Sequence, residues 1–240
     1  MKRISKLEVS CPDGVVYKKI DFNQDELDKE VEFKCAANTN AVVILDGSIQ
    51  GTNETGLDWK FHRKNTNKVE IYALSTLPFK VLFGFGGYPF QERKTNLNTN
   101  LGFIGQCVLT INPYAKESFK SALSTFKNAE ILVENEASNA LRASIVEVIK
   151  GAVGTKFAKL NRAEVESKLY ELKNEKGGIA DQLESFFASK GLDFSKGDFT
   201  ISVNFPADFE ERYQEVLQSR ADTKNAAKEI EILNNLKDKK

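Results

Sequence analysis

The sequence has no excess of positive or of negative charge. Lysine and arginine total 34 residues, aspartate and glutamate also total 34, and the formal net charge is therefore zero. A balanced chain has no long-range field with which to attract a phosphate backbone or an anionic membrane. Nucleic acid is accordingly not an expected partner. The same balance removes the self-repulsion that keeps monomers apart, which fits self-association without establishing it.

Long apolar runs are also missing. The first residues, MKRISKLEVSCPDG, carry basic side chains without a following apolar segment, so no secretory signal is predicted and a cytoplasmic location is expected. The most apolar stretches, such as residues 79–85, have the length of strands, and none reaches the roughly 18 residues of a membrane-spanning helix. Any membrane contact is therefore expected to be peripheral, at the inner face, or made through a partner.

Residues for catalysis and metal binding are scarce. The three cysteines, Cys11, Cys35 and Cys107, are widely spaced and form no CxxC pair, which favours reduced thiols over disulfides or a zinc site. The single histidine, His62, has no cysteine or serine motif that would place a nucleophile beside it. The carboxylates are dispersed without a distinguished pair. We predict no catalytic site, no metal, no cofactor and no small-molecule substrate.

What the first half does contain is strand patterns separated by turn residues. Asp46-Gly47, between apolar residues 41–45 and residues 48–50, predicts a β-hairpin. In the long apolar stretch 102–111, Phe103, Cys107 and Leu109 share parity and should lie on one face. Strands are predicted at 31–35, 41–45, 48–50, 57–61, 69–74, 79–85 and 102–111. Residues 1–113 are therefore predicted to be a mainly antiparallel β domain.

Helical patterns dominate the second half. Asn112-Pro113 predicts the start of a helix, and apolar residues spaced by three and four predict another over 131–149, ended by Gly151 and Gly154. A third helix should begin at Asn161, with Glu164 reaching back as in a capping box. The glycines at 177 and 178 either weaken one helix or separate two, and the pattern does not decide between them.

The chain closes with a strand and a helix. Gly191 should end the preceding helix, and residues 199–205 alternate as a strand. From Pro206 the chain is predicted to be an amphipathic helix with imperfect heptads. The predicted domains are 1–113, 114–205 and 206–240, in an α+β fold. The tail residues predicted to mediate assembly are Tyr213, Val216, Leu217, Ile230, Leu233 and Leu236.

One further stretch, residues 83–90, is rich in glycine and aromatic residues. Gly84-Phe85-Gly86-Gly87 lacks the helix start of a dinucleotide-binding loop and the Gly-Lys-Ser/Thr of a P-loop, so a bulge or a turn between two strands is expected. The surrounding aromatic side chains have two interpretations. They pack in the core, which is the ordinary case, or they form an exposed patch for a membrane surface or a partner. These residues are Phe83, Phe85, Tyr88 and Phe90.

Several phrases, and the order of elements, resemble the SPFH or band 7 domain of the stomatin, prohibitin and flotillin superfamily, in its cytosolic virion core protein-like branch. The resemblance covers roughly residues 30 to 220 and concerns organisation, since no catalytic motif carries it. The resembling phrases are CAANTNAVVILDG (35–47), NETGL (53–57), GFIGQCVLTINP (102–113), LRASI (141–145), GLDF (191–194) and FTISVNFP (199–206).

The resemblance implies a fold and a role. It implies a non-enzymatic scaffold that self-associates and organises proteins at the cytoplasmic face of a membrane through a recruiting partner. The chain departs from stomatin-like members in lacking their hydrophobic amino-terminal segment, and from flotillin-like members in its shorter tail. An alternative role is that of a structural component of a phage or compartment shell, because SPFH-like modules also resemble shell-building domains.

Overall fold

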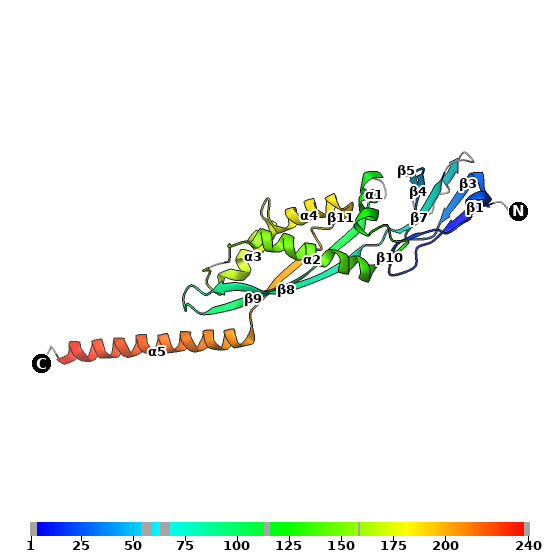
Figure 1. Ribbon diagram of the computed structural model, residues 1–240. Coiled ribbons are helices and arrows are strands. Elements are labelled where there is room, and N and C mark those ends of the chain that lie inside the picture. The colour runs from blue at the N-terminus through cyan, green and yellow to red at the C-terminus, as the bar shows by residue number, and fades with distance from the viewer. Residues whose placement is uncertain (1–3, 54–58, 63–67, 113–115, 158, 238–240) are drawn as a thin grey trace. The chain divides into compact units, whose positions relative to one another are not determined.

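The computed structural model describes residues 4–53, 59–62, 68–112, 116–157 and 159–237 (Figure 1). Its strands and helices together make an α+β fold, as predicted. The strands are β1 Ile4–Val9, β2 Val15–Lys19, β3 Leu27–Cys35, β4 Thr39–Leu45, β5 Ser48–Asn53, β6 Trp59–His62, β7 Val69–Ser75, β8 Phe79–Gln91, β9 Asn98–Ile111, β10 Ile131–Val133, β11 Leu192–Phe194 and β12 Thr200–Asn204. The helices are η1 Gln24–Glu26, α1 Lys116–Thr125, α2 Glu134–Val153, α3 Glu164–Asn174, α4 Ile179–Ser189 and α5 Ala207–Lys237.

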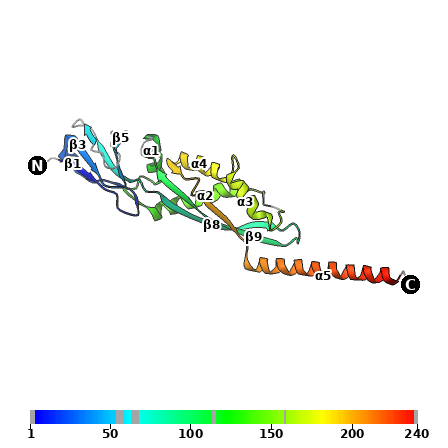
Figure 2. The same cartoon turned by 180° about the vertical axis from the view of Figure 1, so that it is seen from behind.

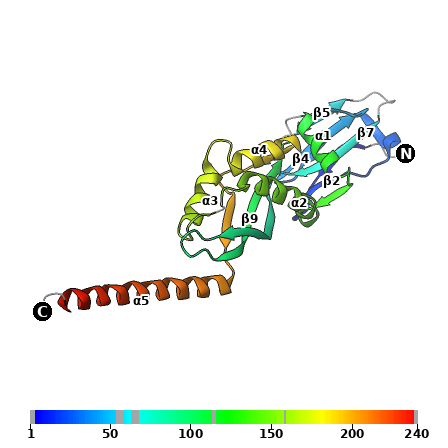
Figure 3. The ribbon, with the colours of Figure 1, turned by 60° about the vertical axis from the view of Figure 1, so that its left-hand side comes forward.

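The strands form three sheets. The first has the order β1-β3-β6 and the second the order β10-β2-β7-β4-β5, whose central strands lie side by side in Figure 3. In the third, β9 pairs with β11, β12 and β8. Most pairs with a defined register are antiparallel, as predicted, but β1 runs parallel to β3. The predicted hairpin is confirmed, because β4 pairs with β5 and Asp46 and Gly47 both have positive φ, as a two-residue hairpin turn requires.

Contacts divide the chain into two interleaved units. The first comprises residues 1–83, 105–152 and 174–200, and the second comprises residues 84–104, 153–173 and 201–240. In the first unit, the three-stranded and five-stranded sheets share a core of small and branched apolar residues with Phe33 and Phe61. Beside it, Tyr17, Tyr72 and Phe119 meet edge to face, with Phe119 on α1 fully buried.

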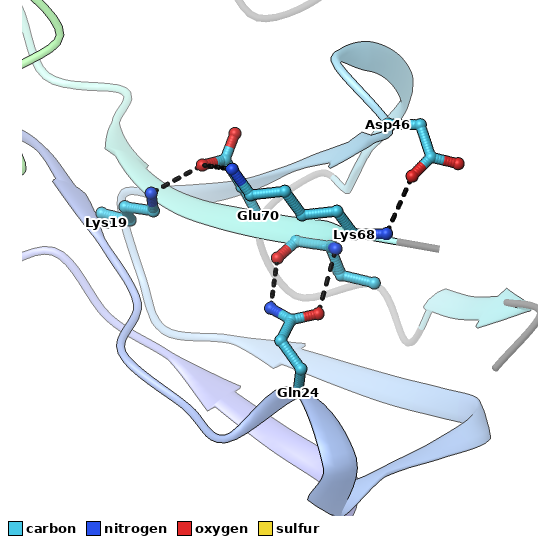
Figure 4. A network of polar contacts seen from close by, with 6 residues as sticks. Lys19, Gln24, Asp46, Lys68 and Glu70 are labelled. Carbon is cyan, nitrogen blue, oxygen red and sulfur yellow. Dashed lines mark hydrogen bonds and ion pairs between the residues drawn. The ribbon is translucent and has the colours of Figure 1, made fainter. Parts of the chain in front are cut away.

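A polar network fixes the start of β7 in the first unit (Figure 4). The Gln24 side-chain amide pairs with the backbone of Val69, as a residue of a neighbouring strand would. Its Nε2 donates to the carbonyl oxygen of Val69 at 2.6 Å, and its Oε1 accepts from the Val69 amide at 3.1 Å. The Lys68 amide donates to Asp46 Oδ1 at 2.8 Å, and Lys19 Nζ contacts Glu70 Oε1 at 2.7 Å. Backbone groups that would otherwise lack partners at the start of β7 are thereby satisfied.

Two sequence predictions are wrong in detail. Residues 131–133 form strand β10, not the first turn of a helix, because they pair with β2; α2 begins at Glu134 and continues through Gly151 to Val153. Lys127 and Asn128 both have positive φ, which breaks the helical path before β10. The stretch Gly84 to Gly87 lies inside the continuous strand β8, not between two strands, although Gly87 does adopt a positive φ.

The glycines at 177 and 178 separate two helices, which decides between the two predicted alternatives. Helix α3 ends at Asn174 and α4 begins at Ile179, with Gly177 at a φ of 74° between them. Gly191, at a φ of 75°, ends the α4 segment as predicted, and the short strand β11 follows.

Candidate assembly surface

The base of α5 is held in an aromatic cluster of the second unit. Phe209, in the first turn of α5, is 1% exposed and lies against Phe90 of β8 and Phe205, with ring centroids 6.2 and 5.3 Å away. Tyr213, one turn later and half-buried, stacks on Phe209 at 5.9 Å. Rings at these separations contribute about 0.5–1.5 kcal/mol per pair beyond their buried area. The helix is therefore fixed to its unit through its first two turns.

Arg162 supports the same cluster from the segment that leads into α3. Its guanidinium carbon lies 4.1 Å from the centre of the Phe205 ring, and its Nε donates to Glu210 Oε1 on α5 at 2.6 Å. Its Nη1 is also 3.6 Å from Glu166 Oε1. The planar guanidinium of an arginine can stack on an aromatic ring and, at the same time, donate hydrogen bonds to a carboxylate. Arg162 thereby connects α3 to the base of α5.

Glu92 organises the tip of the β8–β9 hairpin. Its side chain is 0% exposed, and its Oε2 accepts from the Thr95 amide at 2.5 Å and the Thr95 hydroxyl at 2.8 Å. Its Oε1 accepts from the Arg162 amide at 3.2 Å. Burial alone would raise the pKa of Glu92, but these hydrogen bonds to the carboxylate outweigh it and lower the pKa below its ordinary value. An ionised, fully bonded Glu92 therefore holds the tip against the α3 segment.

Two arginines complete the attachment. Arg93 donates through Nε to Asn161 Oδ1 at 3.2 Å and contacts Glu164 Oε1 through Nη2 at 2.9 Å. The Asn161 amide donates to Glu164 Oε2 at 2.9 Å, as the sequence predicted, although the side-chain oxygen of Asn161 accepts from Arg93 and α3 begins at Glu164. Farther along α5, Arg220 donates to the carbonyl oxygen of Lys94 at the tip. The attachment thus extends through about four turns of α5.

Beyond Leu217 the surface of α5 is open. From Gln218 to Glu231 every side chain is exposed, and Ile230 is 59% exposed. Figure 2 shows α5 as one long, continuous helix that leads to the carboxyl end. Apart from the bond of Arg220 to Lys94, the side-chain hydrogen bonds of the described residues in this part are local, such as Gln218 Nε2 to Asp222 Oδ1 at 2.9 Å. The apolar residues of α5 are not gathered on one stripe over its whole length, so the predicted amphipathic tail is corrected.

The predicted assembly residues divide accordingly. Tyr213 is engaged within its own unit, Val216 and Leu217 are partly exposed, and Ile230 is open. The side chains of Leu233 and Leu236 lie outside the part of the chain whose side chains are described. Sequence reasoning missed Glu92, Arg162 and Phe209 as the residues that hold α5, because each depends on a partner distant in sequence.

The aromatic residues near Gly84 do not form an exposed patch. Phe83 and Phe90 are 4% and 3% exposed, and Phe83 stacks on Phe199 at 6.3 Å. Phe85 and Tyr88 are partly exposed but both contact Phe103, at 5.1 and 5.7 Å. The rings pack internally because other aromatic side chains meet them. These partners are Phe103 on β9, Phe157, Phe199, Phe205 and, on α5, Phe209.

The structure also shows the surroundings of the three cysteines and the histidine. Cys11 is partly buried, and Cys35 and Cys107 are buried. Burial raises the pKa of Cys11 to about 11 and that of Cys107 to about 12, so both remain thiols at neutral pH. His62 is exposed and lies 3.6 Å from Glu30 Oε2 across the β3–β6 pair. Among the described residues, no three His, Cys, Asp or Glu side chains are grouped as a metal site.

No family model matches this chain, and no curated protein matches it. The SPFH resemblance therefore remains a prediction that rests on sequence phrases and element order. In the part of the chain that the structure describes, none of the helices combines the length and the apolar character needed to cross a bilayer.

Proposed function

We propose that this chain is a non-enzymatic, SPFH-like scaffold that self-associates through the distal part of α5. The observation that carries the proposal is the contrast within this helix: its base is fixed by rings and ion pairs up to Arg220, and the side chains of residues 221–231 beyond it are all exposed. The order of hairpin, long strands, helices, strand and long helix supports the SPFH-like interpretation.

The physics of isolated helices favours a partner for this segment. Most helical stability in proteins comes from packing, and helices shorter than about 12–15 residues are marginal alone in water. The exposed segment has few internal side-chain bonds to compensate. A second copy offers the packing that one copy does not supply.

A heptad row shows where that second copy would pack. Val216, Thr223 and Ile230 are separated by seven residues, and Ser219 and Ala226 fall between them at spacings of three and four. Phe209 lies seven residues before Val216, so the row continues the helix position that is buried at the base, turned by about 20° per heptad. The base occupies the start of this row, and the exposed positions from Ser219 to Ile230 remain available for assembly. Ser219 and Thr223 make the seam small and partly polar, which favours weak association.

The setting of the assembly follows from the resemblance. We propose that the assembled scaffold organises proteins at the cytoplasmic face of a membrane through a recruiting partner, and that its work is binding and not turnover. The copies would cluster the recruited protein by presenting several identical sites at once, which strengthens even a weak interaction.

The test is the mass of the protein in solution by light scattering over a range of concentrations. The intact chain should exceed the mass of one copy, and truncation after Gln218 should return it to that mass. Ile230→Lys should weaken association at least tenfold, because it places a charge in the seam. Ala221→Lys is the matched control, since it adds the same charge on the opposite side of the exposed helix and should leave association unchanged.

Two results would contradict the proposal. A single-copy mass for the intact chain at high concentration would remove self-association altogether. If Ile230→Lys and Ala221→Lys changed association equally, the chain would still self-associate, but not through the proposed row of Val216, Thr223 and Ile230.

A further inference from the structure

The heptad row proposed for assembly on α5 has two unlike flanks, and the first of them is acidic. Each of the three residues of the row that repeat at seven is directly preceded by a carboxylate. These carboxylates are Glu215, Asp222 and Glu229. All three are exposed, and their seven-residue spacing places them beside the row, on one side of the helix. This flank of the row is therefore uniformly negative.

The flank on the other side of the row carries no carboxylate. The intervening members of the row are Ser219 and Ala226, and the residues that directly follow them are Arg220 and Ala227, both exposed. Arg220 donates through one nitrogen to the carbonyl oxygen of Lys94. A guanidinium has five N–H donors, so the others can reach a second acceptor. These two positions thus carry one positive charge and no negative charge.

The two flanks distinguish the two orientations in which a second copy can pack. In a parallel pair of helices, the flank before the row faces the flank after the row of the other copy, whereas reversing one helix brings like flanks together. A parallel pair places Glu215 beside Arg220 of the second copy. It also places Asp222 beside the uncharged Ala227 of the second copy. An antiparallel pair places carboxylates against carboxylates.

The conflict in an antiparallel pair does not depend on register. The carboxylates occupy the same position of successive heptads, so sliding one helix by seven residues only exchanges one carboxylate for another. Like charges that face each other across an interface oppose association, and charges beside the seam set the orientation of paired helices. Because Ser219 and Ala226 make the seam small, its packing is weak and the flanking charges decide the orientation.

We propose that the copies associate in parallel and in register, with the acidic flank of each α5 beside the Arg220 flank of its neighbour. This inference rests on the proposed self-association through α5 and specifies its geometry. Parallel packing brings the bases of the helices, and the second units that hold them, to the same end of the assembly. Identical sites would then be presented on one side, as clustering a recruited protein at one membrane face requires.

Cysteine cross-linking of the full-length protein tests the orientation. Equal residues face each other in a parallel, in-register pair, so Ser219→Cys should give a disulfide-linked dimer on oxidation with copper phenanthroline. The readout is a doubled mass under non-reducing conditions. In an antiparallel pair that joins the exposed segments, Ser219 faces the far end of the row. A cross-link would then require mixing Ser219→Cys with Ile230→Cys. Ala221→Cys, on the opposite side of the helix, is the control and should not cross-link.

The native thiols leave this readout clear. Cys35 and Cys107 are buried. Cys11 is partly buried, and burial raises its pKa to about 11, so it stays protonated at neutral pH. The oxidised wild-type protein measures any background that remains.

Charge variants give an independent readout by light scattering. Glu215→Gln should weaken association about threefold, because it removes the contact with Arg220 of the second copy. Glu211→Gln, which removes an exposed carboxylate away from the row, is its control and should have no effect. Glu229→Lys should change association by less than about twofold in a parallel pair. In an antiparallel pair the same variant would strengthen association about tenfold, because the new lysine would meet the carboxylates of the second copy.

The outcomes separate this inference from the proposed function. A mass of one copy at every concentration would overturn both. Association without a cross-link in Ser219→Cys alone, or tightened by Glu229→Lys, would overturn the parallel orientation and leave self-association in place. A cross-link in Ser219→Cys alone, with association that Glu229→Lys leaves unchanged, would support it.

Discussion

The β4–β5 turn and the tip of the β8–β9 hairpin both reverse a strand, but they are stabilised differently. The first needs two residues, Asp46 and Gly47, whose positive φ values match a two-residue hairpin. The second needs six residues, a fully buried carboxylate at Glu92 and a backbone amide contributed by Arg162. The first turn is determined by local backbone preference, and the second by a group seventy residues away in sequence.

The same distinction separates two glycines of the first unit with nearly equal backbone angles. Gly47 and Gly191 have φ values of 76° and 75°. A Cβ at Gly47 would meet nothing within 4 Å, whereas a Cβ at Gly191 would lie 1.8 Å from the carbonyl oxygen of Ser118 on α1. Gly47 is required for its conformation alone, and Gly191 is required for both its conformation and the close approach of α1.

Gly191→Ala should have the largest effect. The substitution adds an unfavourable φ and a collision with the backbone of α1, and a backbone carbonyl has little freedom to move aside. We expect a loss of about 3–5 kcal/mol in the free energy of unfolding, measured in urea. Gly197→Ala, in the loop after β11 and with open space around it, is the control and should change stability much less. Similar losses for the two variants would show that α1 does not pack on Gly191.

Glu92→Ala should come next. It leaves the buried Thr95 amide and the partly buried Arg162 amide without their acceptor, at about 1–3 kcal/mol for each unsatisfied group, so we expect a loss of about 3 kcal/mol. Glu166→Ala, which removes an exposed carboxylate, is the control and should change stability by less than about 0.5 kcal/mol. Urea unfolding measures both.

The pH dependence of Glu92 provides an independent check. Because its pKa in the folded chain is lowered, its contribution to stability should be fully present above its ordinary value of 4.5 and should be lost as the pH falls toward the folded value. The wild type should therefore lose more stability below pH 4.5 than Glu92→Ala does. Parallel pH profiles for the two proteins would contradict an ionised, bonded Glu92.

These comparisons also explain how much the sequence could predict. The β4–β5 hairpin, the glycine at the end of α4 and the buried parity of Phe103, Cys107 and Leu109 were all predictable, because local backbone preference or strand periodicity determines them. The strand at 131–133 was not, because its apolar residues continue the pattern of α2, and pairing with β2 alone makes it a strand.

The attachment of α5 was least accessible to sequence reasoning. Glu92 has the composition of a surface residue, and nothing in its neighbourhood signals that it is fully buried. Arg162 likewise resembles any helix-flanking arginine until Phe205 and Glu210 are placed around it. Periodicity correctly predicted a helix from Pro206 onward, but which residues face the second unit depends on contacts that a single sequence does not display.

Gly47→Ala should have the smallest of these effects. The added methyl group meets open space, so the cost is limited to holding an alanine at positive φ, which is about 1 kcal/mol in the free energy of unfolding. Gly47→Asn should recover part of that loss, because asparagine adopts this conformation more readily. The Asp46 carboxylate also accepts from the Lys68 amide at 2.8 Å, and the Asp46 amide donates to the Lys68 carbonyl oxygen at 2.9 Å, so long-range bonds also tie the turn to the start of β7. If Gly47→Ala cost as much as Gly191→Ala, the turn would depend on surrounding contacts as the hairpin tip does, and the contrast between local and long-range stabilisation would fail.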